Sequence, residues 1–232
     1  MKLIWFGHSA FRIELTHAVI LIDPFFTGNP KFQCSIDEAA EGATHIVITH
    51  GHDDHLGDAA EIAKKTGAQI IANFEICMHL NSKGAQNINP GNTGGTIDCV
   101  SFSVTFTQAL HSSAAIVDGQ FVYLGNPNGM VVKAKDAPSI YHMGDTDLFS
   151  DMALIAEIHA PQIGIVPVGD RFTMSGKTAA LAVKRFFQFD TVIPCHYGTF
   201  DILAPDASAF VAAMEGHPAK VRIPRIGEAM VF

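Results

Sequence analysis

Short apolar runs, each ended by a polar turn, divide the first part of the chain. Residues 2–6 and 10–15 have the pattern of strands, and residues 18–22 form a short apolar run that ends at an Asp-Pro pair. Residues 45–49 are apolar and rich in β-branched side chains, as expected of a strand that is buried on both faces. The sequence therefore predicts a series of short strands, the last of which lies in the protein interior.

The next segment has the pattern of alternating helices and strands. Residues 53–65 carry the signals of a helix, because Asp53 can cap its start and Gly67 can end it. A strand at residues 68–72 and a helix at residues 74–82 follow. Together with the preceding buried strand, these segments predict a βαβ unit.

The pattern changes after residues 87–95, a stretch rich in Gly and Asn that we interpret as a loop. Residues 97–109 alternate in polarity, which favours antiparallel strands. Residues 121–123 and 130–132, separated by Gly-Asn-Pro-Asn-Gly, predict a hairpin. The rest predicts strands at residues 139–142, 163–168 and 191–194, helices at 149–159, 177–187 and 206–214, and two short closing strands.

Each half of the chain thus begins with strands and continues with βα units. This order predicts an α/β fold in which two sheets pack face to face with helices outside. We expect one domain over residues 1–232, with halves of about 1–95 and 96–232, because no repeat or flexible linker divides the sequence. A composition of 48% hydrophobic and 16% charged residues agrees with a folded globular protein.

Net charge and hydropathy limit the classes of molecule with which the protein is expected to interact. The formal net charge is −8, and the 15 Lys and Arg residues form no basic run, so no nucleic-acid partner is expected. No apolar stretch approaches the roughly 18 residues of a membrane span, and the apolar run at the amino terminus is too short for a signal peptide. We therefore expect a cytoplasmic protein that acts on a small molecule, and self-association into a homo-oligomer is compatible with the sequence. The four cysteines are widely spaced and predict free thiols.

The unusual feature is the motif at residues 50–55, His-Gly-His-Asp-Asp-His, where a buried strand ends and a helix begins. Ligands of open sheets lie at such strand ends. Residues i and i+2 of an extended segment point the same way, so His50 and His52 can converge on one metal ion. Asp54 and His55 can serve a second ion beside it. Imidazole and carboxylate donors suit zinc, manganese, iron or nickel.

Four ligands do not complete two metal sites. Three further candidates each follow a predicted strand: His111, Asp145 and His196. Since strand ends meet at one edge of an open sheet, we expect these side chains to complete the sites.

This series of motifs resembles that of the metallo-β-lactamase superfamily over nearly the whole chain. The segments Gly-His-Ser-Ala-Phe-Arg-Ile, Leu-Ile-Asp-Pro-Phe and Pro-Cys-His-Tyr-Gly-Thr-Phe are similar to its metal-dependent hydrolase branch, which includes ascorbate-6-phosphate lactonase-like proteins. The resemblance implies a four-layer αβ/βα sandwich. It places His50, His52 and His111 on metal one and Asp54, His55 and His196 on metal two, with Asp145 bridging the pair.

The implied activity is hydrolysis. Two cations ~3.5–4 Å apart can share a water, convert it to a metal-bound hydroxide near neutral pH and polarise the bond it attacks. We expect two divalent metal ions, zinc first, with manganese, nickel or iron as alternatives, and a small ester, lactone, amide or phosphodiester as substrate. The residues expected to take part in catalysis are Asp54, Asp145 and His8.

Other residues are candidates for substrate contact or for support of the ligands. His8, Asp23 and Asp53 lie at strand or helix ends near the expected ligands, although each also suits an ordinary structural role. Arg171 and Lys177 could meet an anionic substrate or be exposed loop charges. Related proteins often have Asn before the Phe-Thr-Met segment, where this chain has Arg171, so the substrate of a relative does not transfer directly.

Two alternatives remain open at this point. The first is a non-haem iron redox enzyme on the same scaffold, such as a persulfide dioxygenase-like protein. Diiron redox members replace the second histidine of the His-x-His pair with Glu, whereas His52 is present here. The second alternative is a metal-binding protein without turnover.

Overall fold

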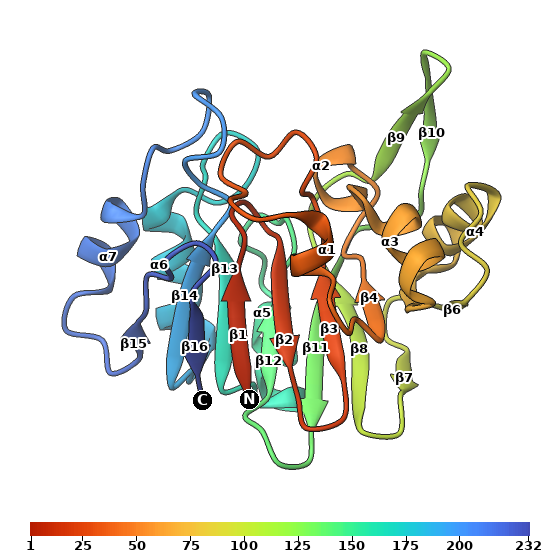
Figure 1. Cartoon of the computed structure of the whole chain (residues 1–232). Helices are drawn as coiled ribbons and strands as arrows, with labels where there is room; N and C mark the ends of the chain where they lie inside the picture. Colours follow the sequence, from red (N-terminus) through yellow and green to blue (C-terminus); the bar gives the residue numbers. More distant parts are fainter.

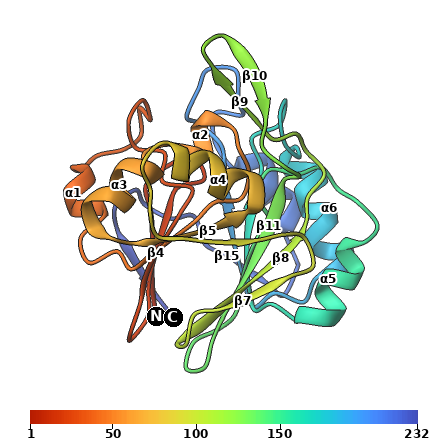
Figure 2. The same ribbon diagram turned by 90° about the vertical axis from the view of Figure 1, so that its right-hand side faces the viewer.

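Two seven-stranded sheets pack face to face, and helices cover both outer faces (Figures 1 and 2). This computed structural model describes residues 1–232. The first sheet has the order β16 (Ala229–Val231), β1 (Lys2–Trp5), β2 (Phe11–Glu14), β3 (Val19–Ile22), β4 (His45–Val47), β5 (Gln69–Asn73) and β6 (Ile88–Gly91). The second has the order β15 (Lys220–Val221), β14 (Thr191–Cys195), β13 (Ile163–Pro167), β12 (Ile140–His142), β11 (Asn128–Ala134), β8 (Phe102–Gln108) and β7 (Thr96–Asp98). The predicted pair of sheets with helices outside is confirmed.

The helices form the outer layers on the two sides seen in Figure 2. Four lie with the first half of the chain: α1 (Ile36–Ala39), α2 (Asp53–Leu56), α3 (Ala59–Thr66) and α4 (Phe74–Ser82). Three lie with the second half: α5 (Met152–His159), α6 (Gly176–Phe186) and α7 (Ser208–Met214). The structure contains no helix with the length and the hydropathy that a membrane span requires.

Successive residues of the central strands face two different layers of the core. Ile20 and Ile22 belong to a cluster of 40 buried residues that joins the two sheets and continues under α5 to α7. Leu21 belongs instead to a cluster of 22 residues between the first sheet and its helices. Because adjacent strand residues point to opposite faces, a strand between two layers must be apolar throughout. This explains the unbroken apolar runs of the sequence.

The parallel strands of both sheets end at the same edge of the sandwich. β3, β4, β5 and β6 run parallel in the first sheet, and β12, β13 and β14 run parallel in the second. The loops that follow these strands gather at the top of Figure 1. This edge therefore collects side chains from segments that are far apart in the sequence.

The hairpin predicted from residues 121–123 and 130–132 is wrong. β10 (Gln120–Tyr123) pairs with β9 (Ala114–Val117), a strand that the sequence did not reveal, and the two form a separate projecting sheet. β11 pairs with β8 and β12 instead. The reason is burial. The first five residues of β11 are buried, and a Cβ on Gly129 in this strand would lie 2.7 Å from Thr107 Oγ1 in β8. That strand fits only in the middle of the sheet.

Two further expectations need correction. Residues 87–95 are not all loop, since β6 pairs with β5. The helix predicted over residues 53–65 is interrupted at Gly57 into α2 and α3, and His52 rather than Asp53 is the residue before α2. A Cβ on Gly57 would lie 2.4 Å from the carbonyl oxygen of Pro24, and its φ is 43°. The close approach of this loop explains the interruption.

The chain returns to the first sheet at its end. β16 pairs with β1, and the terminal residues Met1 and Phe232 exchange backbone hydrogen bonds. The two termini lie side by side in both ribbon views (Figures 1 and 2). The first sheet is thus built from both ends of the sequence, and the chain passes from the first sheet to the second between β6 and β7.

Candidate metal centre

The His-Gly-His-Asp-Asp-His segment follows β4 and leads into α2, at the edge of the sandwich where the parallel strands of both sheets end. His52 is extended, with φ −76° and ψ 149°, so the chain leaves the sheet before it turns into the helix. Gly51 is required here because a Cβ would lie 2.6 Å from the side chain of Leu124. Its backbone N–H donates to Ser113 Oγ at 2.9 Å. The segment is therefore fixed against the loop that carries His111.

Asp145 joins the three later strand ends to this segment. Its Oδ2 lies 2.9 Å from His196 Nε2, 3.4 Å from His55 Nε2 and 3.7 Å from His111 Nε2. The turn before Asp145 depends on Gly144, whose φ is 64°. The Gly144 N–H donates to Nδ1 of His142, the last residue of β12, at 3.0 Å. All three distant candidates are thus brought to the motif.

The ligand atoms form three groups, and within each group the atoms lie within 4.8 Å of one another. The first donor group is His50, His52 and His111; the second donor group is His8, Asp54, His55 and His196; and the third, which links them, is His50, His55 and Asp145. All seven predicted ligands appear in these groups. His8 is the one addition that the predicted ligand set did not contain.

Asp23 orients the ring of His55 directly and the ring of His50 through Thr49. Its Oδ2 accepts hydrogen bonds from His55 Nδ1 at 2.8 Å and from Thr49 Oγ1 at 2.7 Å. Because that threonine gives its proton to Asp23, its oxygen accepts from His50 Nδ1 at 3.0 Å. Asp23 thereby fixes the Nδ1 proton of both rings, so that Nε2 is the nitrogen directed at a metal, as carboxylates behind metal-bound histidines do.

The first donor group lies nearer the surface. His50 Nε2 and His52 Nδ1 face each other at 2.9 Å, and His52 Nε2 contacts Ser112 Oγ at 3.2 Å. His50 is fully buried, but His52 and His111 are partly exposed. This group therefore forms the open side of the site.

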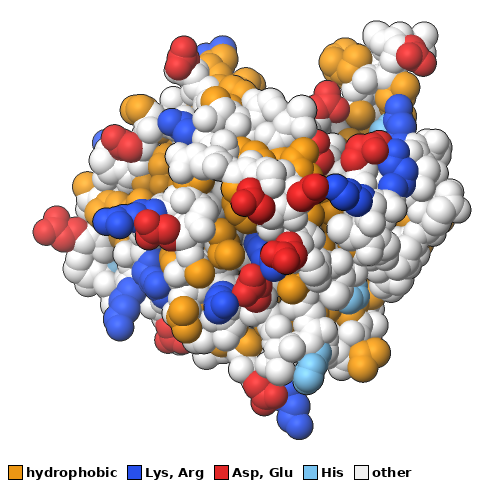
Figure 3. Space-filling view, viewed as in Figure 1, with side chains coloured by type: hydrophobic (Ala, Val, Ile, Leu, Met, Phe, Trp, Pro, Cys, Tyr) orange, Lys and Arg blue, Asp and Glu red, His pale blue; other side chains and the backbone are white.

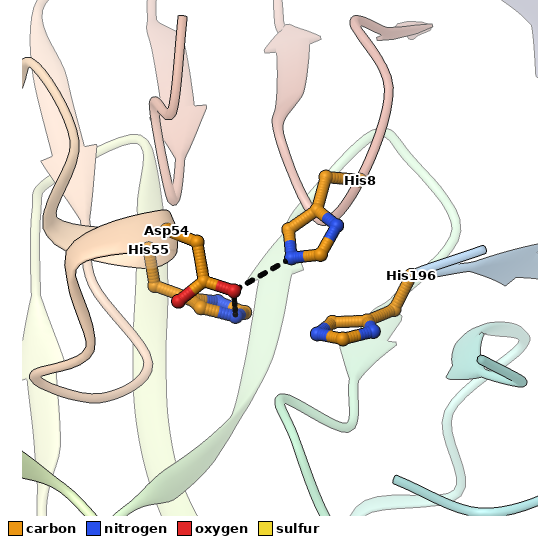
Figure 4. Close-up of side chains that lie close together, drawn as sticks. All are labelled: His8, Asp54, His55 and His196. Carbon is orange, nitrogen blue, oxygen red and sulfur yellow. Dashed lines mark hydrogen bonds and ion pairs between the residues drawn. The ribbon is translucent and has the colours of Figure 1, made fainter. Parts of the chain in front are cut away.

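His8 belongs to the buried side. Its Nε2 lies 2.9 Å from Asp54 Oδ2, and its ring centroid lies 3.9 Å from that of His196 (Figure 4). Its Nδ1 lies 3.0 Å from Thr199 Oγ1. The rings of Phe25 and Phe200 stand edge-on to it at 5.7 and 5.6 Å. The candidate supporting residue thus contacts the ligand set directly and is flanked by aromatic side chains.

Burial controls the protonation of most of the histidines. It holds the pKa of His50 well below its usual range and also lowers the pKa of His52 and His111. Burial, and after it the neighbouring His196, lowers the pKa of His8 to about 4. A neutral imidazole has a free nitrogen lone pair, which is the form that binds metal.

His55 differs because carboxylates surround it. Burial lowers its pKa, but Asp145 and then Asp23 outweigh that effect and raise the pKa well above its usual range. For Asp145 itself, burial raises the pKa, and the charges of His196 and His55 outweigh it and hold the pKa well below its usual range. The buried side therefore pairs ionised carboxylates with a protonated imidazole.

These residues fit divalent metal ions. Three buried ligand atoms, His55 Nε2, Asp145 Oδ1 and His196 Nε2, make no hydrogen bond of good geometry, although Asp145 Oδ2 lies close to both ring nitrogens. Such burial is costly unless another group binds these atoms. The donors are imidazoles and carboxylates, the set preferred by zinc, manganese, iron and nickel. Cys195 is buried next to a ligand in sequence, but it is absent from every group of ligand atoms.

The remaining candidates lie outside the ligand groups. Asp53 is exposed and its side chain makes no hydrogen bond. Arg171 is exposed, with its guanidinium 5.8 Å from the ring of Phe172. Lys177 lines a cavity of ≈ 320 Å³ beside Asp170 and the start of α6. No observed contact connects these three side chains to the ligands.

Sequence reasoning missed the hydroxyl groups that hold the histidine rings. Thr49, Ser112 and Thr199 each contact a ring nitrogen of a candidate ligand or of His8. Two of them are direct neighbours in sequence of a ligand, and Thr199 lies in the Cys-His-Tyr-Gly-Thr segment. A search for hydroxyl residues beside each ligand would have found them.

Known proteins resemble the chain throughout. A family model described as the β-lactamase superfamily domain matches residues 2–196. A protein of Methylocella silvestris named UPF0173 metal-dependent hydrolase is 67% identical over 232 residues, which is 100% of each chain. The structure of Igni18, a metallo hydrolase from Ignicoccus hospitalis, has a TM-score of 0.88 at 36% identity and covers 100% of this chain and 97% of its own. An isothiocyanate hydrolase from Delia radicum gut bacteria shares the fold, with a TM-score of 0.80 at 21% identity over 100% of this chain and 99% of its own.

Proposed function

This chain belongs to the metallo-β-lactamase superfamily and is a metal-dependent hydrolase, and on that premise we propose that it acts through a binuclear metal centre. The observation that carries the proposal is the separation of the ligand atoms into two donor groups that share one carboxylate between them. His50, His52 and His111 would hold one ion, and Asp54, His55 and His196 the other. Asp145 would contact both.

Bound divalent cations would supply Lewis acidity and a water activated near neutral pH. The protein supplies orientation and exclusion of solvent. Asp23 holds the Nδ1 protons of His55 directly and of His50 through Thr49, so both rings keep Nε2 directed into the site. We call the fully buried residues Asp23, Thr49 and His55 the floor of the site. The floor keeps bulk water away from these nitrogens, and low solvent access strengthens the electrostatic stabilisation of developing charge.

The surroundings favour a small substrate with an apolar substituent. Phe25 and Phe200 flank His8, with ring centroids 6.3 Å apart, and Phe200 is 39% exposed. The part of a substrate that extends from the open first donor group over the second donor group meets these rings. We therefore propose small esters, lactones, amides or phosphodiesters with an aryl or alkyl group as substrates. Isothiocyanates join this set because a protein of the same fold hydrolyses them, as its name states.

Metal analysis combined with hydrolysis assays tests the proposal. The purified protein should contain two divalent cations per chain, and assays for zinc, manganese, nickel and iron would identify them. Chelation should abolish hydrolysis of the substrate panel, and the added metal should restore it. His50→Ala and His111→Ala should lose one of the two ions, and Asp145→Asn should bind both more weakly. All three should lose turnover, whereas His159→Gln, at the end of α5, should retain both ions and turnover. Normal turnover in all three site variants, or in chelated protein, would overturn the proposal.

The expected self-association and cytoplasmic location stay predictions. A redox activity stays an alternative outcome of the metal assay: stoichiometric iron with no hydrolysis of any panel member would support it.

A further inference from the structure

His8 is placed as a ligand would be. One ligand atom each from His8, Asp54, His55 and His196 lie within 4.8 Å of one another, and Figure 4 shows that their polar atoms face a common space. The side chain of His8 is fully buried, and so is that of His55. Three different loops deliver these residues, after β1, β4 and β14. Their convergence is therefore a product of the tertiary fold.

The backbone at His8 is held in an unfavourable conformation. Its φ is 54° and that of His196 is 60°, both in the left-handed region that non-glycine residues rarely adopt. The carbonyl oxygen of His8 accepts from the His196 N–H at 2.9 Å and from Trp5 Nε1 at 2.9 Å. Such strain persists only where surrounding contacts maintain it, and it gathers at functional sites.

The hydrogen-bond partner of Nδ1 permits the tautomer that a ligand needs. Thr199 Oγ1 lies 3.0 Å from His8 Nδ1 and can donate its own proton to the Tyr197 carbonyl at 3.4 Å. Nδ1–H then donates to this hydroxyl, which leaves the lone pair of Nε2 directed at the second donor group. A metal-bound histidine has this kind of partner behind it. The alternative tautomer would make His8 only a hydrogen-bond donor to Asp54.

We propose that His8 is a ligand of the second metal ion. This inference rests on the proposed binuclear function. The second ion would then have four protein side chains of its own as well as Asp145, whereas the first would have three histidines and Asp145. Sites whose positions are filled by protein act structurally, and catalytic sites keep an open position. The first ion has one protein ligand fewer and lies on the open side, so we expect water and substrate to bind there. We expect the second ion to bind first, because its donor group includes the carboxylate of Asp54.

Cobalt titrations of metal-free variants test this assignment. His8→Gln keeps an amide that can donate to Asp54, but it removes the imidazole. We expect His8→Gln and His8→Ala to weaken binding of the first cobalt equivalent by at least about 10-fold and to change its visible absorption spectrum. His111→Gln should leave the first equivalent unchanged and weaken the second. His159→Gln is the matched control, and circular dichroism checks that each variant is folded.

A count of imidazoles gives a second measurement that needs no change at His8. In His111→Gln loaded with one equivalent of cobalt, X-ray absorption should show three imidazoles on the metal, from His8, His55 and His196. Two imidazoles there, or binding of the first equivalent by His8→Gln within about threefold of wild type, would overturn the proposal. Wild-type protein that still binds two ions and hydrolyses its substrates would leave the binuclear function intact in that case. Failure of wild type to bind two ions would overturn both.

Discussion

The two donor groups of the site are built in different ways. The first group, His50, His52 and His111, lies on the open side, and its rings contact each other edge-on at centroid distances of 4.6 to 5.1 Å. The second group lies against the floor, where two of its histidine side chains are fully buried and the third is 2% exposed. One group is held largely by its own members, and the other by the surrounding protein.

Charge separates the two groups as well. Both groups contact Asp145, but the first contains imidazoles alone, whereas the second also contains Asp54 and contacts the carboxylate of Asp23. Coulomb attraction for a divalent cation is therefore stronger on the floor, where burial also limits screening. From this difference we infer that the second group binds its ion firmly, whereas the ion at the first group exchanges ligands with solvent.

Asp145→Asn should have the largest effect, because Asp145 is the carboxylate that contacts both groups. Support residues behind ligands cost about 10- to 100-fold, so loss of this shared carboxylate should reduce kcat/KM by more than about 100-fold. Both cobalt equivalents should bind more weakly. Metal content and steady-state kinetics measure the result, and a variant that loses only one ion would show that Asp145 does not join the groups.

Asp23→Asn should come next. The amide cannot accept all three hydrogen bonds that Asp23 now receives, from His55 and from the backbone and hydroxyl of Thr49. We expect the second group to lose about 10- to 100-fold in metal affinity, and the first group less, since it depends on Asp23 only through Thr49. The free energy of unfolding of the metal-free protein should fall by about 1–3 kcal/mol, which is the cost of an unsatisfied buried donor.

Asp58→Asn is the matched control for that variant. Asp58 also accepts from backbone N–H groups, those of Phe26 and Thr27 at 3.0 and 2.8 Å, but it contacts no candidate ligand. Chelator competition should show normal metal affinity in the control. Equal losses in both variants would mean that Asp23 acts on the loop and not on the ligands.

The sequence predicted that the candidate ligands after regular strands would lie together, because parallel strands bring their ends to one edge whatever the conformation of the loops. His111, Asp145 and His196 were found in this way. The pairing of His8 with Asp54 and Thr199 was not, since it depends on two loops 191 residues apart and on left-handed backbone that no local pattern announces. The break at Gly57 likewise reflects a tertiary contact. Local sequence signals predict helices and strands. Contacts between loops that are distant in the sequence determine which side chains meet in the site.

The pH dependence of metal binding should distinguish the groups. Carboxylates raise the pKa of His55 well above its usual range, so the metal-free second group holds a proton at neutral pH that binding must release. Burial lowers the pKa of His50, so the first group is already neutral there. Affinity of the second group should rise by about tenfold per pH unit while pH stays below the His55 pKa. The first group should show little change above about pH 6.5.

Calorimetry in buffers of different ionisation enthalpy measures this proton release directly. At about pH 6.5, one proton should leave with the ion that binds the second group, and clearly less than one with the ion that binds the first, whose bound water is only partly ionised there. His111→Gln, which retains the second group, should keep the release. Equal proton release at both steps would remove the electrostatic difference between the groups.

Ser112→Ala should have the smallest effect. Its hydroxyl contacts His52 Nε2 at 3.2 Å in an exposed position, where water can replace it. We expect the affinity of the first group to fall by about threefold at most, below the 10- to 100-fold expected for buried support, and the second group to stay unchanged. A loss as large as that of Asp23→Asn would mean that the open side is as firmly held as the floor, and that exposure does not separate the two metal positions.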